Sequence, residues 1–442
     1  MAGDRGHTPA SPSVARLTSS SIAPPERRRR RRSQAKPPAL AETRYDALTL
    51  PVFRAYQAAR ILTVFALQIQ GVAVGWQVYS LTGNAMDLGW VGLAQFLPTL
   101  VFWPLIGMAV DRFDRRDLLV ACWIAIGFAT LGLAAFDYSG SHAMPALLAC
   151  NFAIGLARAF SSPASQSILP ELVPGEYYPN ALTWSSTVFQ LGAIGGPALG
   201  GAIFAVLGAA WKVHLVASAC AVAGAVAILR VPRPGPATTA GNRGAVFDGL
   251  KFVVSRPEML AALSIDLVAV LFGGVVALLP IYAHDRLGGG PDTLGWLRAA
   301  PAAGAAVCAV WMSRFPVTRR AGAKMLSAVV LFGVATIAFA VSTNLGLSLV
   351  ALFVAGAADE VSVVIRQCIV QMQTPNEMRG RVSTVNWLFV SVSNELGQFE
   401  SGLAAAWLGL VPAAIAGGVV AVITAGIAAA AVPKLRNFDR LS

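Results

Sequence analysis

The chain has 442 residues, of which 56% are hydrophobic and 13% charged, and its formal net charge is +12. Soluble globular domains are about half apolar and about a quarter charged, so this composition excludes an ordinary soluble domain. Charge-poor runs of the roughly 20 residues needed to cross a bilayer occur repeatedly along the chain. They predict an integral membrane protein with many spans.

The first 50 residues are polar, rich in Pro and Ser, and include six successive arginines, Arg27 to Arg32. Such a segment buries too little apolar surface to fold, so we expect a disordered cytoplasmic tail at 1–50. The polar sequence continues to Leu50, which argues against a signal peptide. The arginines are expected either to anchor the topology or to bind anionic membrane lipid.

Twelve apolar segments follow the tail, six on each side of a polar stretch at 231–255. They lie at about 56–80, 87–110, 118–137, 144–166, 182–207, 211–230, 258–282, 292–313, 323–342, 346–369, 383–408 and 412–432. The expected fold is an all-α membrane protein with twelve transmembrane helices. Its expected parts are a six-helix bundle at 51–230, a cytoplasmic linker at 231–255, a second six-helix bundle at 256–433 and a cytoplasmic tail at 434–442.

Basic residues in the loops predict the orientation. Fourteen Lys and Arg residues lie in the loops on the side of the N-terminus, and two, Lys212 and Arg286, lie on the other side. Because Lys and Arg are retained in cytoplasmic loops, both termini are expected in the cytoplasm.

The two sets of six segments resemble each other. A shift of 201 residues lays Gly155 on Gly356, Gln166 on Gln367 and Gly196 on Gly397, and Leu88-Gly89-Trp90 recurs as Leu294-Gly295-Trp296. This predicts a duplicated six-helix unit. Two such bundles related by a pseudo-two-fold axis are the physical basis of alternating access in secondary transporters.

Two motifs lie in the first set of segments. The loop after the second segment has the pattern G-x-x-x-D-R-x-x-R-R, and its residues are Gly107, Asp111, Arg112, Arg115 and Arg116. The fifth segment has G-x-x-x-G-P-x-x-G-G, with Gly192, Gly196, Pro197, Gly200 and Gly201. The alternatives are a merely basic cytoplasmic loop for the first motif and ordinary small-residue helix packing for the second.

These motifs resemble the major facilitator superfamily. Pro375 to Val382, Phe53-Arg54 and Ala59-Arg60 are similar to the branch that includes the bacterial enterobactin exporter and drug:proton antiporters. The resemblance implies a multi-pass protein of the bacterial inner membrane, a loop that acts as a conformational latch, and proton-driven export of a siderophore or drug-like small molecule. An importer or facilitator of the same fold is the first alternative, and a non-transporting receptor or polytopic enzyme is the second.

No catalytic or metal-binding constellation is expected. The histidines and cysteines are scattered, without the spacing of a metal site or a disulfide framework, at His7, His142, His214, His284, Cys122, Cys150, Cys220, Cys308 and Cys368. The chain is therefore interpreted as a non-enzyme without cofactor or metal. Its expected partners are membrane lipid, protons and a small-molecule substrate, with no nucleic acid, and it is expected to be monomeric.

Several charged residues fall inside the apolar segments. Near mid-depth lie Arg158, Asp266, Asp359, Glu360 and Glu395, with Glu400 and Arg298 further out. Each costs at least about 2.5 to 3.5 kcal/mol there, so each is expected to have a partner or a function. Arg158 and Asp359 are equivalent under the 201-residue shift and are predicted to form an ion pair, which leaves proton carriage to Glu395 or Glu360.

Aromatic and amide residues in the segments are candidates for lining a substrate cavity. These are Trp76, Gln77, Gln95, Gln190 and Asn394. The alternative is that they pack helices together or lie in the membrane interface.

Overall fold

A computed structural model describes residues 46–140, 143–233, 245–315, 320–375 and 378–436. Every regular element in these ranges is a helix. The first half has six long helices, α1 (Pro51–Thr82), α2 (Ala85–Arg112), α3 (Arg115–Tyr138), α4 (Met144–Leu172), α5 (Tyr178–Leu207) and α6 (Ala210–Ile228). The second half has α8 (Pro257–Gly273), α10 (Pro291–Arg314), α11 (Ala321–Val341), α12 (Leu345–Gln373), α13 (Arg379–Leu408) and α14 (Leu410–Ala431).

Short helical elements join or precede the long ones. They are η1 (Ala47–Thr49), η2 (Gly175–Tyr177), α7 (Ala245–Val254), η3 (Val276–Leu278), α9 (Leu279–Ile281), η4 (Tyr282–Arg286) and α15 (Pro433–Arg436). Ala47, within the stretch expected to be a tail, is fully buried, and its backbone N–H donates to Asn180 Oδ1 at 2.9 Å. The first part of the tail, 1–45, lies outside the described residues.

Eleven stretches of the described chain are long and apolar enough to span a membrane, and one of them, Pro257–Arg286, joins α8 to η4. The 30-residue α13 is as long as its neighbours but carries more polar side chains, Glu395 and Glu400 among them. With α13 as the twelfth, these helices match the twelve expected spans. The predicted all-α membrane fold is confirmed.

Local sequence explains where the helices begin and end. Asn84 caps α2 by accepting a hydrogen bond from the Met86 N–H at 2.9 Å, and Asp114 caps α3 by accepting from the Arg116 N–H at 2.9 Å. Gly83 after α1 and Gly208 after α5 have φ of 62° and 70°, a backbone conformation that glycine adopts without a β-carbon clash. Long helices joined by such tight turns run antiparallel to one another.

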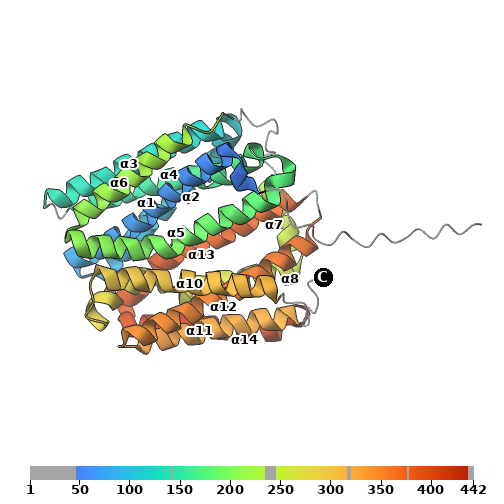
Figure 1. Cartoon of the computed structure of the whole chain (residues 1–442). Helices are drawn as coiled ribbons and strands as arrows, with labels where there is room; N and C mark the ends of the chain where they lie inside the picture. The colour runs from blue at the N-terminus through green and yellow to red at the C-terminus, as the bar shows by residue number, and fades with distance from the viewer. Residues whose placement is uncertain (1–45, 141–142, 234–244, 316–319, 376–377, 437–442) are drawn as a thin grey trace, which may run out of the picture. The chain divides into compact units, whose positions relative to one another are not determined.

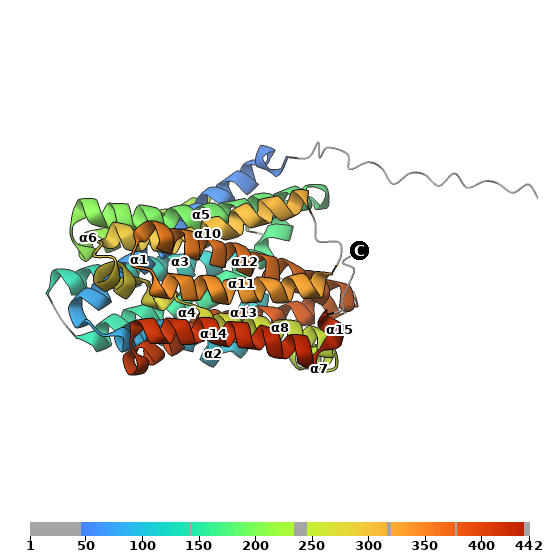
Figure 2. The ribbon, with the colours of Figure 1, turned by 90° about the horizontal axis from the view of Figure 1, so that it is seen from below.

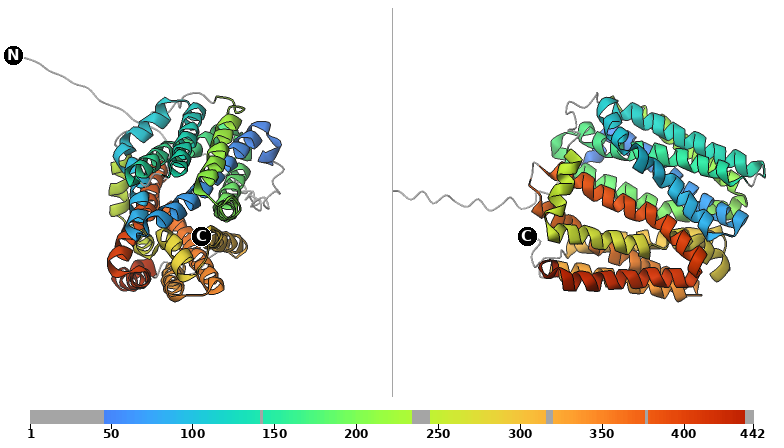
Figure 3. Two further views of the ribbon diagram at one scale, coloured as in Figure 1. Left: turned by 90° about the vertical axis from the view of Figure 1, so that its left-hand side faces the viewer. Right: turned by 180° about the vertical axis from the view of Figure 1, so that it is seen from behind.

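Helix packing follows the same scheme in both halves. In the first half α1 packs on α5 and α6, α3 packs on α4 and α6, and α2 packs on α4. In the second half α8 packs on α13 and α14, α11 packs on α12 and α14, and α10 packs on α12, so each pair has its counterpart. Figure 1 shows the first half in blue to green and the second in yellow to red, and Figure 3 (left) views the helices end-on.

The halves meet along two helix pairs. α5 of the first half packs on α10 of the second, and α13 of the second half packs on α2 of the first. Because α5 corresponds to α13 and α2 to α10, each of these contacts is the counterpart of the other, as expected for a pseudo-two-fold axis between the halves. Figures 1 and 2 both show α5 alongside α10.

Two features of the second half were not anticipated. The stretch predicted as a linker contains α7, which packs on α8 and α13. Its Val253 belongs to a buried cluster with Val382 and Val385 of α13. The segment predicted as one helix at 258–282 is broken at Gly273-Gly274 into α8 and the short turns η3, α9 and η4. Glycine pairs and interior prolines, here Pro280, commonly break membrane helices at functional depth.

Candidate functional site

The bundle has two distinct ends. We call the end at which α1 begins and α14 ends the terminal end, and the opposite end the far end. At the far end the two halves are tightly packed through glycines. A β-carbon on Gly402 would lie 2.8 Å from the Cα of Gly89, and one on Gly201 would lie 3.0 Å from the Cα of Gly295. Only residues without side chains allow α2 and α13, or α5 and α10, to approach this closely.

Polar and aromatic contacts reinforce this closure. The Tyr79 hydroxyl at the end of α1 donates to the Asp285 carboxylate in η4 of the other half. His284 Nδ1 lies 2.6 Å from Asp285 Oδ1, and the His284 ring lies 5.8 Å, between ring centroids, from both Trp76 and Tyr79. The far end is therefore closed by contacts between the halves.

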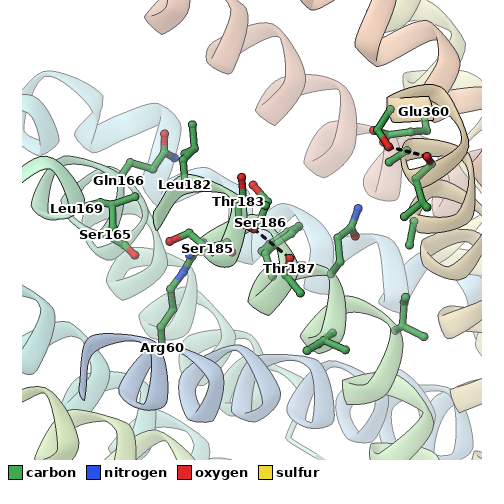
Figure 4. Close-up of a pocket in the computed structure, with 18 of the residues that line it drawn as sticks. Arg60, Ser165, Gln166, Leu169, Leu182, Thr183, Ser185, Ser186, Thr187 and Glu360 are labelled. Carbon is green, nitrogen blue, oxygen red and sulfur yellow. Dashed lines mark hydrogen bonds between the residues drawn. The ribbon is translucent and has the colours of Figure 1, made fainter. Parts of the chain in front are cut away.

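A cavity separates the halves toward the terminal end. It has a volume of about 970 Å³ and is lined by α1, α4 and α5 of the first half and by α10 and α12 of the second. Tyr56 and Tyr178, near the first turns of α1 and α5, and Ser313, in the last turn of α10, lie on its wall. Figure 4 shows Arg60 and the polar residues of α4 and α5 on one side and Glu360 on the other.

Two further cavities continue this space. One of about 710 Å³ is lined by α1, α2, α4, α5 and α13, and one of about 330 Å³ reaches α10. They share Gln95, Arg158, Phe189, Glu395 and Gln398, so they are neighbours across these side chains. We refer to the three together as the central cavity.

The centre of this cavity holds an ion pair between the halves. Arg158 Nη2 lies 3.5 Å from Glu395 Oε1, and Arg158 Nη1 donates to Gln95 Oε1 at 3.1 Å. Gln95 in turn donates to Asn151 Oδ1 at 2.8 Å, which fixes the amide that holds the guanidinium. The predicted pair between Arg158 and Asp359 is wrong in this structure, because Arg158 turns across the cavity to α13 rather than to α12.

Asp266 has a partner that the sequence analysis missed. Arg366 Nη2 lies 3.3 Å from Asp266 Oδ2, with side-chain exposures of 2% and 6%, and Arg366 Nη1 donates to Asn386 Oδ1 at 2.8 Å. Arg366 follows Asp359 by two helical turns, so a cation on the carboxylate-bearing face of α12 was visible in the sequence. It went unnoticed because it lies near the end of its apolar run.

Asp359 belongs to the same charged cluster. It lies close enough to Asp266, Arg366 and Glu360 to interact with them electrostatically. It also lines a separate cavity of about 210 Å³ whose walls include Asn394 and Gln398, and these two residues also line the central cavity. A carboxyl group thus stands between a buried ion pair and a polar path to the central cavity.

The other candidates divide into two groups. Gln95, Gln190 and Asn394, the candidates for cavity lining, line the central cavity, and so do Glu360 and Glu395. The structure gives Glu400 no hydrogen bond or ion pair with another described residue. Gln77 is only 2% exposed and bonds to Asp137 and His214, both at 2.9 Å. Trp76 packs against Phe204 and His284 at the far end. Neither Trp76 nor Gln77 lines the central cavity, so this expectation is wrong for both.

The glycine motif of α5 lies against two helices. A β-carbon added at Gly192 would contact Val64 of α1. One at Gly196 would lie 2.5 Å from the Gln68 β-carbon, and one at Gly200 would lie 3.0 Å from the Ile69 Cα. Gly201 instead meets α10, where a β-carbon would lie 2.5 Å from the Pro291 carbonyl oxygen, and the Pro197 carbonyl faces Gly295 of the same helix. The motif therefore sets how closely α5 approaches both its own half and the other.

The loop between α2 and α3 is tied to its own half. Arg115 forms an ion pair with Glu171 of α4, and Arg116 Nη2 donates to the Leu229 carbonyl at the end of α6 at 3.0 Å. Arg112 is exposed, and a β-carbon at Gly107 would meet nothing within 4 Å. The Asp111 side chain lies outside the described residues. The loop in this structure binds the first half together at the terminal end.

The part of the chain that the structure describes contains no group of three or more His, Cys, Asp or Glu side chains suited to a metal ion. Its chemistry lies instead in charged and amide groups around the central cavity. Together with two equivalent six-helix halves, this arrangement defines a membrane transporter of the major facilitator fold.

Comparison with known proteins identifies the family. The family model described as "Transmembrane secretion effector" matches residues 42–442. The chain belongs to this family of the major facilitator superfamily.

Curated relatives and solved structures agree with this assignment. The multidrug efflux pump Tap of Mycolicibacterium fortuitum is 30% identical over 84% of this chain and 93% of its own length. The enterobactin exporter EntS of Shigella dysenteriae serotype 1 is 26% identical over 78% of this chain and 83% of its own. A crystal structure of a bacterial homologue of the lysosomal transporter Spinster, inward-facing and occupied, has a TM-score of 0.69 at 16% identity, covering 87% and 97% of the two chains.

Proposed function

We propose that the protein exports a small amphipathic molecule from the cytoplasm by alternating access, in exchange for protons. The observation that carries the proposal is the central cavity between the halves, which extends toward the terminal end while the far end is closed by contacts between the halves. Two rigid bundles that rock about such a cavity would expose it to one side of the membrane at a time.

The excess of Lys and Arg in the loops at the terminal end supports a cytoplasmic location for that end. The structure then corresponds to an inward-facing state, ready to take substrate from the cytoplasm. Export agrees with the roles of the two relatives, a multidrug efflux pump and an enterobactin exporter. The glycine motif of α5, which resembles the antiporter motif, also favours export over import.

Asp359 is the proposed proton carrier. Its carboxyl group faces a small cavity beside the central one, and it interacts with the buried pair of Asp266 and Arg366. Protonation removes its charge, which changes the electrostatic balance of that cluster and therefore the relative stability of conformations that bury it differently. The sequence predicted Glu395 or Glu360 as the carrier. Glu395 is engaged by Arg158 in the cavity and is assigned to gating on the substrate side instead.

The loop between α2 and α3 is proposed to act as the latch. In this structure Arg115 and Arg116 bond within the first half, and a β-carbon at Gly107 would meet nothing within 4 Å. When the terminal end closes, the exposed face around Gly107 and Arg112 would meet the second half. Because Gly107 has no side chain and leaves this surface of α2 open, another helix can approach it closely in the conformation in which the terminal end is closed.

Transport by the reconstituted full-length protein tests the proposal. Inverted membrane vesicles that contain the protein are tested with a panel of cationic, neutral and anionic fluorescent amphipathic dyes. At least one dye should accumulate when the vesicle interior is made acidic, and a protonophore should abolish the accumulation. Accumulation that is equal with and without the gradient would identify a facilitator. Accumulation driven only in right-side-out vesicles by an acidic exterior would identify a proton-coupled importer.

A further inference from the structure

The central cavity contains an arginine that has no partner among the residues the structure describes. Arg298, in the second turn of α10, lines the 330 Å³ cavity, and no described residue forms a hydrogen bond or ion pair with it. It approaches α1 at Gly71, where an added β-carbon would lie 3.0 Å from the Arg298 Nη1 atom. The glycine thus provides room for the guanidinium next to the cavity.

Such an arginine is unusual at this depth. The guanidinium is always ionised and carries five N–H donors, so protonation chemistry cannot remove its charge. Arginines inside a membrane protein are normally paired or face water, because an unpaired charge is costly there. The donors of Arg298 therefore remain available to a molecule that enters the cavity.

The charge balance of the cavity is positive. The 330 Å³ cavity is lined by two cations, Arg158 and Arg298, and by one carboxylate, Glu395. Glu395 is engaged by Arg158, although the closest N–O distance is 3.5 Å, which is long for a charge-assisted hydrogen bond. Arg298 is left without a compensating negative charge among the described lining residues.

The remaining walls are apolar or neutral. Val64, Leu88, Val91 and Phe189 provide an apolar surface, and glutamines such as Gln68 and Gln398 provide neutral hydrogen-bonding groups. The apolar or aromatic part of a ligand would pack against these apolar side chains while its anionic group binds the arginine. Carboxylate, phosphate and sulfonate groups match the planar donor fork of arginine.

We infer that the far end of the central cavity is a binding site for the acidic group of an amphipathic organic anion, with Arg298 as its principal ligand and Arg158 as its neighbour. This inference names the substrate class for the proposed export function, on which it rests. The apolar body of the substrate extends toward the terminal end, where the larger cavities lie.

Equilibrium binding to the full-length protein tests this site without any proton gradient. The protein is placed in phosphatidylcholine nanodiscs and titrated calorimetrically with 2-naphthaleneacetate or with the uncharged 2-naphthaleneacetamide, and empty nanodiscs provide the blank. The acid should bind at least about tenfold more tightly than the amide. Because no gradient is present, a failure of proton coupling would leave this result intact.

Variants assign the preference to Arg298. Arg298→Gln should weaken binding of the acid about tenfold and bring acid and amide within about twofold of each other, while binding of the amide stays as in the wild type and reports an intact fold. Arg298→Lys should keep part of the preference, because it keeps the charge but loses the fork. Arg256→Gln, at an exposed arginine stacked on Phe252, is the matched control and should change neither affinity.

Several outcomes would overturn the inference. These are equal affinities of acid and amide in the wild type, an undiminished preference in Arg298→Gln, or no binding of the acid below about 1 mM. Loss of acid binding when phosphatidylglycerol replaces part of the phosphatidylcholine would show that an anionic lipid headgroup occupies the site instead. Unchanged affinity in those nanodiscs supports a soluble anion.

Discussion

Asp266 is tolerated in the middle of α8 because Arg366 of α12 reaches it, and Asn386 of α13 accepts a hydrogen bond from Arg366 Nη1. The pair is almost fully shielded, whereas Arg158 in the central cavity has a side-chain exposure of 41%. Charge pairs in these two settings have different energetic roles. The buried pair belongs to the fold of the second half, and the cavity pair spans the two halves.

This difference predicts that removing a charge destabilises the protein strongly at the buried pair and little at the cavity pair. Asp266→Ala strands the Arg366 guanidinium and should destabilise the protein by about 3 to 5 kcal/mol, whereas the double variant Asp266→Ala/Arg366→Met should recover much of the loss. Glu395→Gln should unfold close to the wild-type temperature, since Arg158 keeps access to water and to Gln95. Thermal unfolding of purified protein, followed by tryptophan fluorescence, measures all three. Wild-type stability of Asp266→Ala would show that the pair is not structural.

Asp359→Asn tests proton carriage. The amide resembles the protonated carboxyl group but cannot release a proton, so the variant should fold and bind substrate while its export no longer responds to the proton gradient. The matched control is Asp87→Asn, at a carboxylate in the first turn of α2 at the far end, which should leave coupling intact. Protonophore sensitivity of efflux at equal protein abundance is the measurement. Full sensitivity in Asp359→Asn would assign the proton to another group.

For single residues, the sequence predicted which side chains face the interior better than it predicted which charged side chains pair with each other. Gln95, Gln190, Asn394 and Glu395 line the cavity because polar side chains within apolar runs are excluded from lipid and must face the interior. Which interior surface they face depends on helix rotation, which the repeat alone does not determine. For that reason the internal repeat placed Arg158 opposite Asp359, while packing turns it to Glu395.

At the scale of elements, α5 illustrates how small residues determine approach distance. Gly192, Gly196 and Gly200 occupy the face toward α1, and Gly201 faces α10. Gly107 in α2 contrasts with them, because a side chain there would meet open space in this structure. The two motifs therefore predict different consequences when a glycine is enlarged.

Gly196→Leu should disturb this structure, because its β-carbon would lie 2.5 Å from that of Gln68, and overpacking of this kind costs about 1 to 3 kcal/mol. Its unfolding temperature and its transport should both fall. Gly107→Leu should keep the wild-type unfolding temperature but slow transport, if α2 meets the other half when the terminal end closes. Normal transport by Gly107→Leu would argue against the latch, and normal stability of Gly196→Leu would show that α1 can yield.

The helices themselves were largely predictable, since runs of about 20 apolar residues have few alternatives to spanning. The exceptions are short. The helix α7 has only ten residues, which is too short to span the membrane. Its role is seen only in the structure, where it packs on α13 and Asp248 forms an ion pair with Arg381 at 3.0 Å. The break after Gly273 depends on Phe332 and Gly417, which pack against this point from α11 and α14.

At the scale of the whole bundle, the closed far end and the cavity toward the terminal end correspond to one state of the proposed transport cycle. Alternating access requires the far-end contacts to separate while the terminal end closes. Gly75 of α1 and Pro280 of α9 lie on opposite halves at the far end, and a β-carbon on Gly75 would lie 3.2 Å from Pro280 Cγ. The Pro280 β-carbon is one bond away from this Cγ, so the two β-carbons are near enough for a disulfide, which joins β-carbons about 3.5 to 4.5 Å apart.

Cysteines at these two positions should therefore lock the transporter. In a background without the native cysteines, oxidised Gly75→Cys/Pro280→Cys should bind substrate but not transport it, because the halves cannot part at the far end, and a reductant should restore transport. The control is Gly127→Cys/Val222→Cys, which links α3 to α6 within one half, where a Gly127 β-carbon would lie 2.7 Å from Val222 Cγ2. That bond should leave transport unchanged, because the proposed motion keeps each half rigid. Undiminished transport by the fully oxidised Gly75→Cys/Pro280→Cys protein would mean that the cycle proceeds without opening the far end, and the alternating-access proposal would then be wrong.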